Sequence, residues 1–406
     1  MVQAFSTDSR PLSESRNQLN EAVIVSAVRT PIATARKGTL KDTPAEELAT
    51  HILSEAIRRA GIPGESVDDV IFAESLYGGG DLARYAAAAM GLTQVPGQAV
   101  NRHCAGGLTA VGNAAGSIRS GMDRVVVAGG VHSFSTGPAL TWRVPGTDET
   151  QRRIPPTFPY TAEATDDTSV SVGWNLAVKY GLTREQMDAW AVRSHERAIA
   201  AIDAGVFDDE ITPLKVTRPD GSVVEFAIDE HPRRDTSLAK AAALKPLHPE
   251  IDAFSITAAN SSGMNDAAAA LTLTSSSYAA EQGLQPLGTI RAWGAIGVDP
   301  KYTGDGGIVS IPLVLKRAGI SLSDVALWEI NEAFASVPVA ACQELGIDDG
   351  KVNIFGSGCS LGHPIAASGA RMLTTLTHGL RRRGGGIGVA AMCAGGGQGG
   401  AVVVEV

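Results

Sequence analysis

The sequence predicts an α/β protein made of two duplicated halves with a long insertion between them. Three observations support this prediction. Apolar strand-like runs alternate with helical segments, as in α/β architectures with parallel or mixed sheets. Short patterns from the first third of the chain recur near its C-terminus at a nearly constant offset. The stretch between the copies differs from them in amino-acid composition, with more charged residues and more proline.

The duplication is visible at two places in each half. Arg59-Ala60-Gly61-Ile62 is followed by a strand-like run from Asp69, and the same order recurs at Arg317-Ala318-Gly319-Ile320 before Asp324. Both copies predict a helix end, a glycine turn and a buried strand. Cys104 and Gly107 reappear as Cys359 and Gly362, at the 255-residue offset that also separates Asp69 from Asp324. In both halves a strand is expected to lead into a small-residue turn and then a helix, in AVNRHCAGGLTAVGNAAGSIRSG and in NIFGSGCSLGHPIAASGARMLTTL.

These patterns divide the chain into four expected parts. Residues 1–21 form a flexible tail, residues 22–133 with 265–283 form the first half, and residues 284–406 form the second half. The insertion, residues 134–264, contains the helical LTREQMDAWAVRSHERAIAAI and the strand-like TRPDGSVVEFAI. Because an insertion of this size commonly covers a site, we expect a lid or substrate-binding subdomain there.

Composition excludes several classes of protein. A net charge of −9 and a pI near 5.4 argue against a general nucleic-acid binder, which needs a basic face. Arginine clusters could still contact an anionic ligand, although such clusters are more often ordinary solvated surface: Arg152-Arg153, Arg233-Arg234 and Arg381-Arg382-Arg383. No apolar run reaches the roughly 18 to 20 residues of a membrane span, and the polar N-terminus has no signal-peptide core.

The four cysteines are Cys104, Cys342, Cys359 and Cys393. They lack the close CxxC pairs of a zinc site and are too few for a disulfide framework, so no metal is expected and a reducing cytoplasm fits best.

Cys104 is the first candidate for chemistry. It precedes a predicted helix, whose unpaired amides and dipole favour a thiolate over a thiol. The alternative is a buried structural cysteine. His363, in a Gly-His-Pro turn of the second half, would lie near Cys104 if equivalent turns meet across a pseudo-twofold axis; the pair would then resemble other Cys–His nucleophile arrangements, although histidine is often structural.

Two further motifs carry polar or reactive groups. Cys393 follows an apolar strand and enters the glycine-rich bend Gly395-Gly396-Gly397, whose N–H groups could face a developing oxyanion. The bend lacks the patterns of nucleotide-phosphate loops. Asn331, in Asn-Glu-Ala-Phe, follows the strand VALWEI, and a helix N-terminus explains it equally well on local evidence.

Together these motifs resemble the thiolase family. Members carry a nucleophilic cysteine in an NRxCxxGL segment, then Asn-Glu-Ala-Phe, Gly-His-Pro and a C-terminal CxGGG, which stand here as NRHCAGGL, NEAF, LGHPIAASGAR and CAGGGQGGA. The similarity extends over nearly all of the chain from residue 22 to the end, including VIVSAVRTPI and NSSGMNDAAAA.

The resemblance implies a fold, a reaction and roles for residues. The fold is a five-layered αβαβα core with an inserted loop domain that holds coenzyme A. Cys104 carries the acyl group, His363 activates it, and Cys393 is the acid/base for the substrate's α-carbon. His363 with a water held by Asn331 forms one oxyanion site, and backbone amides of Cys104 and Gly395 form another. Ser262 lies beside the pantetheine arm and Arg233 against the adenine.

The resemblance also implies partners. Acyl-CoA and CoA are substrates rather than permanently bound cofactors, and the expected assembly is a homodimer or homotetramer. The reaction is thiolytic cleavage of a 3-ketoacyl-CoA or the reverse Claisen condensation.

Three segments depart from the common family pattern. Thr303-Gly304-Asp305-Gly306-Gly307 stands where many members read Met-Gly-x-Gly-Pro, His132-Ser133-Phe134-Ser135 replaces Glu-Ser-Met-Ser, and Trp174-Asn175 replaces Glu-Asn. These changes concern segments around the acyl and pantetheine pocket, so they bear on substrate identity.

Two other classes of protein share parts of this pattern. A decarboxylating ketoacyl synthase of the same superfamily commonly has a second histidine where Asn331 stands and does not need Cys393. A catalytically silent acyl-CoA-binding or scaffold protein would be favoured by loss of Cys104, His363 or Cys393, and all three are present.

Overall fold

The computed structural model describes residues 20–77, 79–153, 156–161 and 164–406. The expected N-terminal tail, residues 1–21, therefore lies almost wholly outside the described residues. None of the helices within the described ranges combines the length and apolar character that a membrane crossing requires.

The first half contains a mixed sheet in the order β4-β3-β5-β10-β1. Strand β3 runs parallel to β4 and β5, whereas β10 runs antiparallel to both β5 and β1, and the short β2 pairs with the start of β10. The strands are β1 (Ala22–Arg29), β2 (Ala33–Thr34), β3 (Asp69–Ala73), β4 (Gly97–Val100), β5 (Val125–His132) and β10 (Asn265–Ser275).

The second half repeats this topology in the order β12-β13-β14-β11. Strands β12 and β13 are parallel, and β14 is antiparallel to β13 and β11, so each strand has a counterpart with the same direction in the first half. Two residue pairs between β1 and β11 join the halves into one ten-stranded sheet. The strands are β11 (Gly288–Gly297), β12 (Val325–Ile330), β13 (Ile387–Ala394) and β14 (Gln398–Glu405). The duplication predicted from the sequence is thus confirmed.

One predicted strand of the second half is wrong. The run beginning at Asn353, expected to match β4, forms only an isolated parallel bridge between Val352 and Trp328. Asn353 has a φ of 50°, and its side-chain amide bonds both the N–H and the C=O of Ile330, at 2.9 and 2.8 Å. The side chain thereby replaces the backbone hydrogen bonds that a continuing strand would make.

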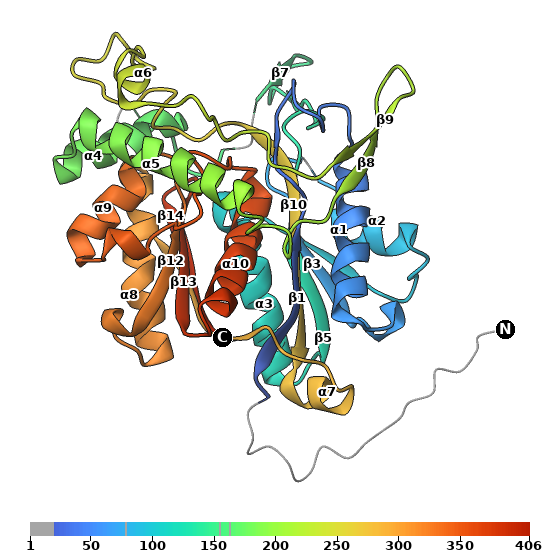
Figure 1. Cartoon of the computed structure of the whole chain (residues 1–406). Helices are drawn as coiled ribbons and strands as arrows, with labels where there is room; N and C mark the ends of the chain where they lie inside the picture. Colours follow the sequence, from blue (N-terminus) through green and yellow to red (C-terminus); the bar gives the residue numbers. More distant parts are fainter. Residues whose placement is uncertain (1–19, 78, 154–155, 162–163) are drawn as a thin grey trace.

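The helices complete five layers (Figure 1). Helices α1 and α2 cover the outer face of the first half-sheet, α8 and α9 cover the outer face of the second, and α3 and α10 lie between the two half-sheets. Their bounds are α1 (Ala45–Ala60), α2 (Leu82–Ala89), α3 (Gly106–Ser120), α8 (Gly306–Ala318), α9 (Ser336–Leu345) and α10 (Ile365–Arg382). The expected αβαβα core is therefore confirmed.

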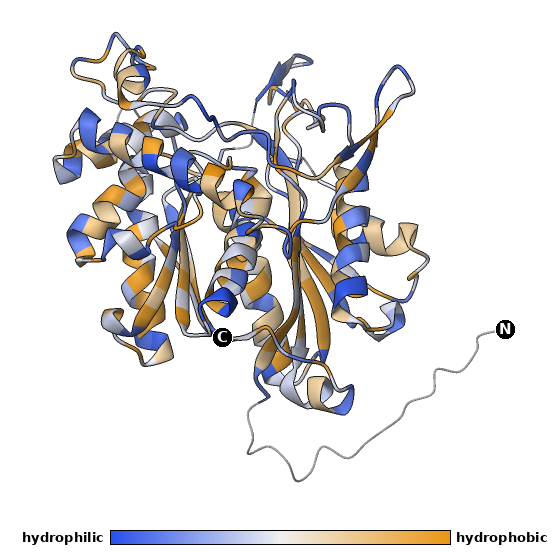
Figure 2. Cartoon of the chain, in the orientation of Figure 1, coloured by the Kyte–Doolittle hydropathy of each residue, from blue (hydrophilic) through white to orange (hydrophobic). Residues whose placement is uncertain are grey.

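Three apolar clusters hold these layers together, one on each outer face and one between the half-sheets. In Figure 2 the strands and the sheet-facing sides of the outer helices are mostly hydrophobic, while the outward sides are hydrophilic. Burial of these apolar faces is the main force that stacks the layers.

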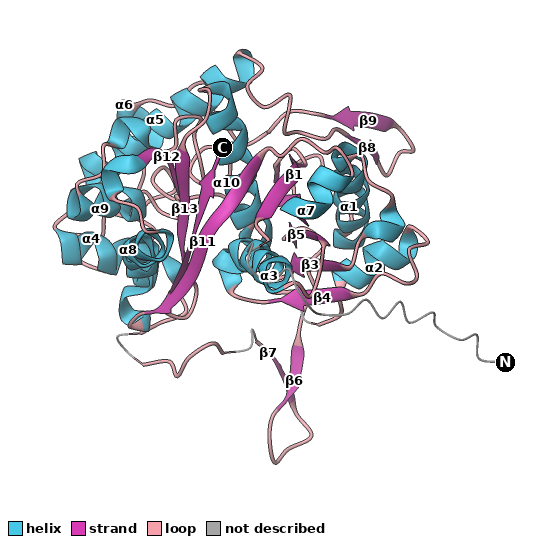
Figure 3. Ribbon diagram, turned by 90° about the horizontal axis from the view of Figure 1, so that it is seen from below, coloured by secondary structure: helices cyan, strands magenta, loops and turns pink. Residues whose placement is uncertain are grey.

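The stretch between β5 and β10 lies over one end of the core (Figure 1). As expected, it contains a long helix and a small antiparallel hairpin, β8–β9. A second hairpin, β6–β7, projects from the body (Figure 3). The elements are β6 (Thr141–Arg143), β7 (Thr150–Arg152), the π-helix Ser169–Trp174, α4 (Asn175–Tyr180), α5 (Arg184–Asp203), β8 (Leu214–Thr217), β9 (Val223–Phe226) and α6 (Leu238–Ala242).

Short helices connect the remaining elements. They are α7 (Ser276–Glu281) and the 3₁₀ turns Gly64–Ser66, His103–Ala105, Pro300–Asp305, Leu322–Asp324 and Asp349–Lys351.

A buried ion-pair cluster ties the inserted stretch to β1. The fully buried guanidinium of Arg29 forms a bidentate pair with Asp229, at 2.8 and 2.9 Å, and its Nε donates to Glu210. Removing Arg29 would leave two buried carboxylates without a counter-charge, so the cluster fixes how the insertion sits over the core.

Candidate active site

One cavity of about 180 Å³ is lined by Cys104, His363 and Cys393. Cys104 comes from the turn before α3, His363 from the corresponding turn before α10, and Cys393 from the end of β13. The predicted convergence of two sulfurs and an imidazole is therefore confirmed.

Glycines let the two central helices approach closely enough to form this cavity. A Cβ on Gly107 of α3 would lie 2.7 Å from the backbone nitrogen of Ala370, and one on Gly369 of α10 would lie 2.4 Å from that of Leu108. Because the helices pack backbone to backbone, the turns at their N-termini meet at the same end of the core.

The turn that presents Cys104 is held by polar contacts. His103 has a φ of 44°, which few non-glycine residues adopt, and its N–H donates to Asn101 Oδ1 at 2.9 Å. The hydroxyl of Ser75 donates to the carbonyl of His103 at 2.9 Å. These contacts stabilise a backbone conformation that would otherwise be strained.

The electrostatic expectation for Cys104 needs correction. Burial raises the pKa of its thiol to about 11, although hydrogen bonds from the backbone amides of Gly395 and Cys104 oppose the shift. Loss of solvation outweighs the effect of the helix N-terminus, so the resting residue is a thiol and requires a base.

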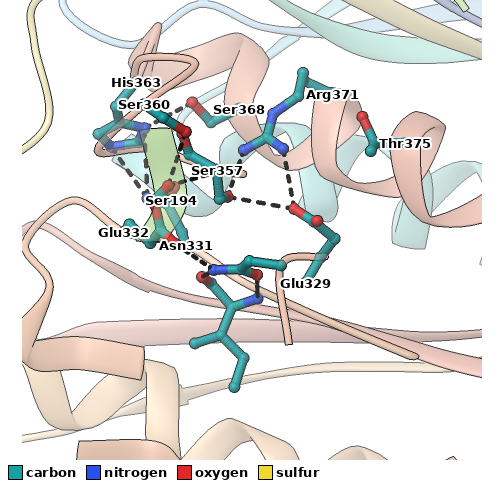
Figure 4. Close-up of polar contacts among 12 residues, drawn as sticks. Ser194, Glu329, Asn331, Glu332, Ser357, Ser360, His363, Ser368, Arg371 and Thr375 are labelled. Carbon is teal, nitrogen blue, oxygen red and sulfur yellow. Dashed lines mark hydrogen bonds and ion pairs between the residues drawn. The ribbon is translucent and has the colours of Figure 1, made fainter. Parts of the chain in front are cut away.

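His363 has the protonation state and orientation of a base. Burial, and then the nearby His132 and Arg371, lower the pKa of its imidazole to about 3, so the ring is neutral. The hydroxyl of Ser368 donates to the carbonyl of Pro364 at 3.0 Å and lies 2.6 Å from His363 Nδ1 (Figure 4). Since that hydroxyl proton is already used, Ser368 accepts the Nδ1 proton. Nε2 is then the unprotonated nitrogen, and its nearest donor among the described residues is Asn331 Nδ2, at 3.5 Å.

Cys393 is buried at the start of a tight turn. Burial, and then the charge that Cys104 would carry, raise the pKa of its thiol well above the usual range. Gly395, the next residue but one, lines the same cavity.

Asn331 lies behind the imidazole and does not line the cavity. It is fully buried, its Nδ2 is 3.4 Å from His363 Nδ1, and its Oδ1 has no hydrogen-bond partner among the described residues. An unpartnered buried amide oxygen is an acceptor ready for a small polar group.

The neighbouring Glu332 anchors this segment. Its buried carboxylate accepts hydrogen bonds at 2.6 to 3.1 Å from four donors: Trp190 Nε1, Ser194 Oγ, Asn353 Nδ2 and the Cys359 amide. Sequence reasoning noted Glu332 only as part of a motif and missed this role, because the donors come from distant segments.

The two predicted CoA-contacting residues lie in an adjoining pocket of about 660 Å³. Ser262 and Arg233 both line it, with Lys240 and His231. Ser262 and Gly263 also line the catalytic cavity, so the two spaces share a wall.

Several lining residues were not assigned a role from the sequence. Phe134 belongs to the segment that departs from the family pattern, and the departure was its only signal. The insertion contributes Thr168 and Val172, and Met264 and Ile365 complete the apolar walls. Within the described ranges, no group of three or more His, Cys, Asp or Glu side chains could hold a metal ion.

Two thiols and a neutral imidazole in one buried cavity of a duplicated five-layered α/β core define a cysteine acyltransferase of the thiolase type. The chain belongs to the thiolase family: residues 22–277 match the model of the thiolase N-terminal domain and residues 284–406 match that of the C-terminal domain. It is a thiolase and therefore an acyltransferase. The two alternatives, a catalytically silent acyl-CoA-binding or scaffold protein and a decarboxylating ketoacyl synthase, are not favoured.

Three of the similar proteins are matched over at least 98% of their own length. The chain is 39% identical to an acetyl-CoA acetyltransferase of Cupriavidus necator, covering 95% of this chain and 100% of the relative. The crystal structure of the Bacillus anthracis acetyl-CoA acetyltransferase superimposes with a TM-score of 0.87 at 39% identity, covering 96% of this chain and 99% of the other. Human mitochondrial 3-ketoacyl-CoA thiolase in complex with CoA superimposes with a TM-score of 0.86 at 33% identity, covering 95% and 98%.

Proposed function

We propose that this thiolase catalyses the reversible CoA-dependent cleavage of a 3-ketoacyl-CoA, or in reverse the Claisen condensation of an acyl-CoA with acetyl-CoA, through an acyl group on Cys104. The observation that carries the proposal is the single cavity shared by Cys104, His363 and Cys393.

In the first half-reaction the Cys104 thiol passes its proton to Nε2 of His363. The proton transfer creates opposite charges within one cavity, and their attraction offsets part of the cost of burial. The thiolate attacks the 3-keto carbon, and the bond between the α-carbon and that carbon breaks. The acetyl-CoA enolate leaves, and Cys393, whose buried thiol holds its proton firmly, protonates the enolate carbon.

In the second half-reaction a CoA thiol gives its proton to the Cys393 thiolate and attacks the acyl-Cys104 thioester. Shortened acyl-CoA departs, and the Cys104 thiolate recovers its proton from His363. Both cysteines and the histidine thus return to their starting states. A thioester suits both steps because a thiolate is a good nucleophile and a good leaving group.

Negative charge forms on a carbonyl oxygen in each step and needs donors aimed at it. The protonated Nε2 of His363, with a water on Asn331, serves one oxygen; the unpartnered Oδ1 of Asn331 supports this assignment. The backbone amides of Cys104 and Gly395 serve the other, which is supported by their position around the Cys104 sulfur.

CoA is proposed to enter through the pocket lined by Ser262 and Arg233, with the inserted residues 134–264 as its cover. The pocket adjoins the catalytic cavity, and its positive side chains suit an anionic nucleotide end. CoA and acyl-CoA act as substrates, and no permanently bound cofactor is required by the mechanism.

A thiolysis assay with free CoA and a panel of 3-ketoacyl-CoAs tests the proposal. Cys104→Ala should form no acyl-enzyme. Cys393→Ala should still accept an acyl group from a simple acyl-CoA, detectable by intact mass, while losing carbon–carbon cleavage. Full thiolysis activity in Cys393→Ala would refute its assigned role.

A homodimer or homotetramer is proposed for the assembly. Strand β4 ends the sheet, with Gln98 and Ala99 exposed, and an open strand edge is a surface on which a second copy can pair. Light scattering of the purified protein at several concentrations tests this; a monomer throughout would contradict it.

The proposed compartment is the cytoplasm. All four cysteines are unpaired in the structure, which suits a reducing environment. Cell fractionation with an antibody to the protein tests this, and recovery only from an organelle or the medium would refute it.

A further inference from the structure

The catalytic cavity lies between two pockets. The segment Ser262–Gly263–Met264 contributes to all three spaces: Ser262 and Gly263 line the pocket proposed for CoA, Met264 lines a second pocket of about 510 Å³, and all three line the catalytic cavity. Phe134 also lines both the catalytic cavity and the second pocket. A 3-ketoacyl-CoA whose reacting carbon lies at Cys104 extends toward CoA on one side and along its acyl chain on the other. If one pocket takes CoA, the other is available for the acyl chain.

The second pocket is cationic rather than purely apolar. Arg36, Arg152 and Arg153 line it, and the described residues that line it include no aspartate or glutamate. Arg153 stacks over Trp142, with its Cζ 5.5 Å from the ring centroid. Arg36 and Arg152 form no ion pair with any described carboxylate. Unneutralised arginines around a pocket favour an anionic occupant.

A histidine adds a second, independent observation. His132 lines the same pocket and is buried, and its Nε2 has no hydrogen-bond partner among the described residues. Its ring is packed edge-on against Phe134, with centroids 4.4 Å apart, at the wall shared with the catalytic cavity. A glutamate is common at this position in the family pattern, so this chain has replaced a carboxylate, which would repel an anionic occupant, with an imidazole that burial keeps neutral by lowering its pKa to about 4.

We propose that this pocket receives an acyl chain ending in a carboxylate, so that the preferred substrates are CoA thioesters of 3-oxo dicarboxylic acids. The inference rests on the proposed thiolase function and specifies its substrate class. The apolar wall of Phe134 and Met264 contacts the methylene groups, and Arg36 and Arg152 bind the terminal carboxylate. Guanidinium groups without an ion-pair partner suit this role, because their hydrogen bonds to a carboxylate are charge-assisted.

The test compares two thioesters of equal chain length. Thiolysis is measured with the CoA thioester of 3-oxohexanedioic acid and with 3-oxohexanoyl-CoA, using the full-length wild-type protein. We expect kcat/KM to be at least tenfold higher for the diacid thioester. In Arg36→Gln, Arg152→Gln and the double variant, KM for the diacid thioester should rise tenfold or more, while KM for 3-oxohexanoyl-CoA and for CoA stays unchanged.

Controls separate this effect from misfolding and from CoA binding. Arg143→Gln removes an exposed arginine from the β6–β7 hairpin that also carries Arg152. Arg143 does not line the pocket, so this variant should change neither KM. Arg36 and Arg152 are themselves exposed, so their variants should melt at the wild-type temperature.

Each outcome bears on the inference. A rise in KM for CoA would assign the arginines to the CoA phosphates and overturn it. Equal or better cleavage of 3-oxohexanoyl-CoA by the wild type would overturn the substrate class while leaving the thiolase function intact. Cleavage of neither thioester, while another 3-ketoacyl-CoA of the panel is cleaved, would overturn the inference alone. Cleavage of no member of the panel would refute the proposed reaction as well.

Discussion

The hydroxyl of Ser368 lies 2.6 Å from Nδ1 of His363 and donates its own proton to the carbonyl of Pro364. His363 stands just before α10, and Ser368 lies five positions further on, in the first turn of that helix (Figure 4). The contact therefore selects the imidazole tautomer from within one helix, and Ser368 acts as a positioning residue for the proposed base.

Ser368→Ala should lower the acylation rate of Cys104 by roughly 10-fold to 100-fold, a partial loss of the roughly 10²- to 10⁴-fold that a general base contributes. The tautomer with the proton on Nε2 becomes accessible and cannot accept the thiol proton. Rapid-quench measurement of acyl-enzyme formation checks this, with KM for acyl-CoA expected to stay constant. Ser368→Thr keeps the hydroxyl and should recover most of the rate; an equal loss in both variants would point to packing instead.

The acylation rate should be independent of pH between about 5 and 9. The pKa of His363 is lowered to about 3 and that of Cys104 is raised to about 11, so in this interval the imidazole is neutral and the thiol is protonated. Below the lower value the base is lost, and the rate falls. Single-turnover acylation followed by mass spectrometry tests this, and a tenfold rise between pH 6 and 8 would show that one of the two groups titrates there.

The sequence predicted the meeting of Cys104 and His363 because the duplication assigns both to equivalent turns. A pseudo-twofold arrangement then requires the turns to meet, whatever the details of packing. The five layers followed from the same pattern together with the family resemblance. These predictions rest on local motifs and on symmetry, which a single sequence displays.

Contacts between unlike segments could not be predicted in this way. The side chain of Asn353 replaces a strand by bonding to Ile330, and nothing in the run from Asn353 to Gly356 signals this. Burial of Cys104 depends on residues from both halves and the insertion. An argument from the helix dipole alone could therefore not predict that the pKa of its thiol is raised. The role of Phe134 likewise depends on which cavities it separates.

Glu332→Gln should destabilise the protein by about 2–4 kcal/mol, since an amide donor would replace a carboxylate among four hydrogen-bond donors. The adjacent Asn331 would also shift, so kcat should fall while KM for CoA changes little. Urea unfolding and steady-state kinetics measure the two effects. Glu344→Gln, on the exposed face of α9, is the control and should stay within about 0.5 kcal/mol of the wild type. Unchanged stability in Glu332→Gln would mean that the cluster tolerates an amide.

Helix α3 offers a matched pair of glycines for testing what holds the two catalytic turns together. A Cβ on Gly107 would meet the backbone of α10 at 2.7 Å, so Gly107→Ala should cost about 1–3 kcal/mol and force the helices apart. Acylation should slow as Cys104 moves away from His363. A Cβ on Gly116, on the same helix, meets nothing within 4 Å, so Gly116→Ala should leave catalysis unchanged and stabilise the helix by roughly 0.5–1 kcal/mol. Denaturant unfolding combined with acyl-enzyme kinetics distinguishes the two variants, and wild-type acylation in a folded Gly107→Ala would show that close approach of α3 and α10 is not what aligns the site.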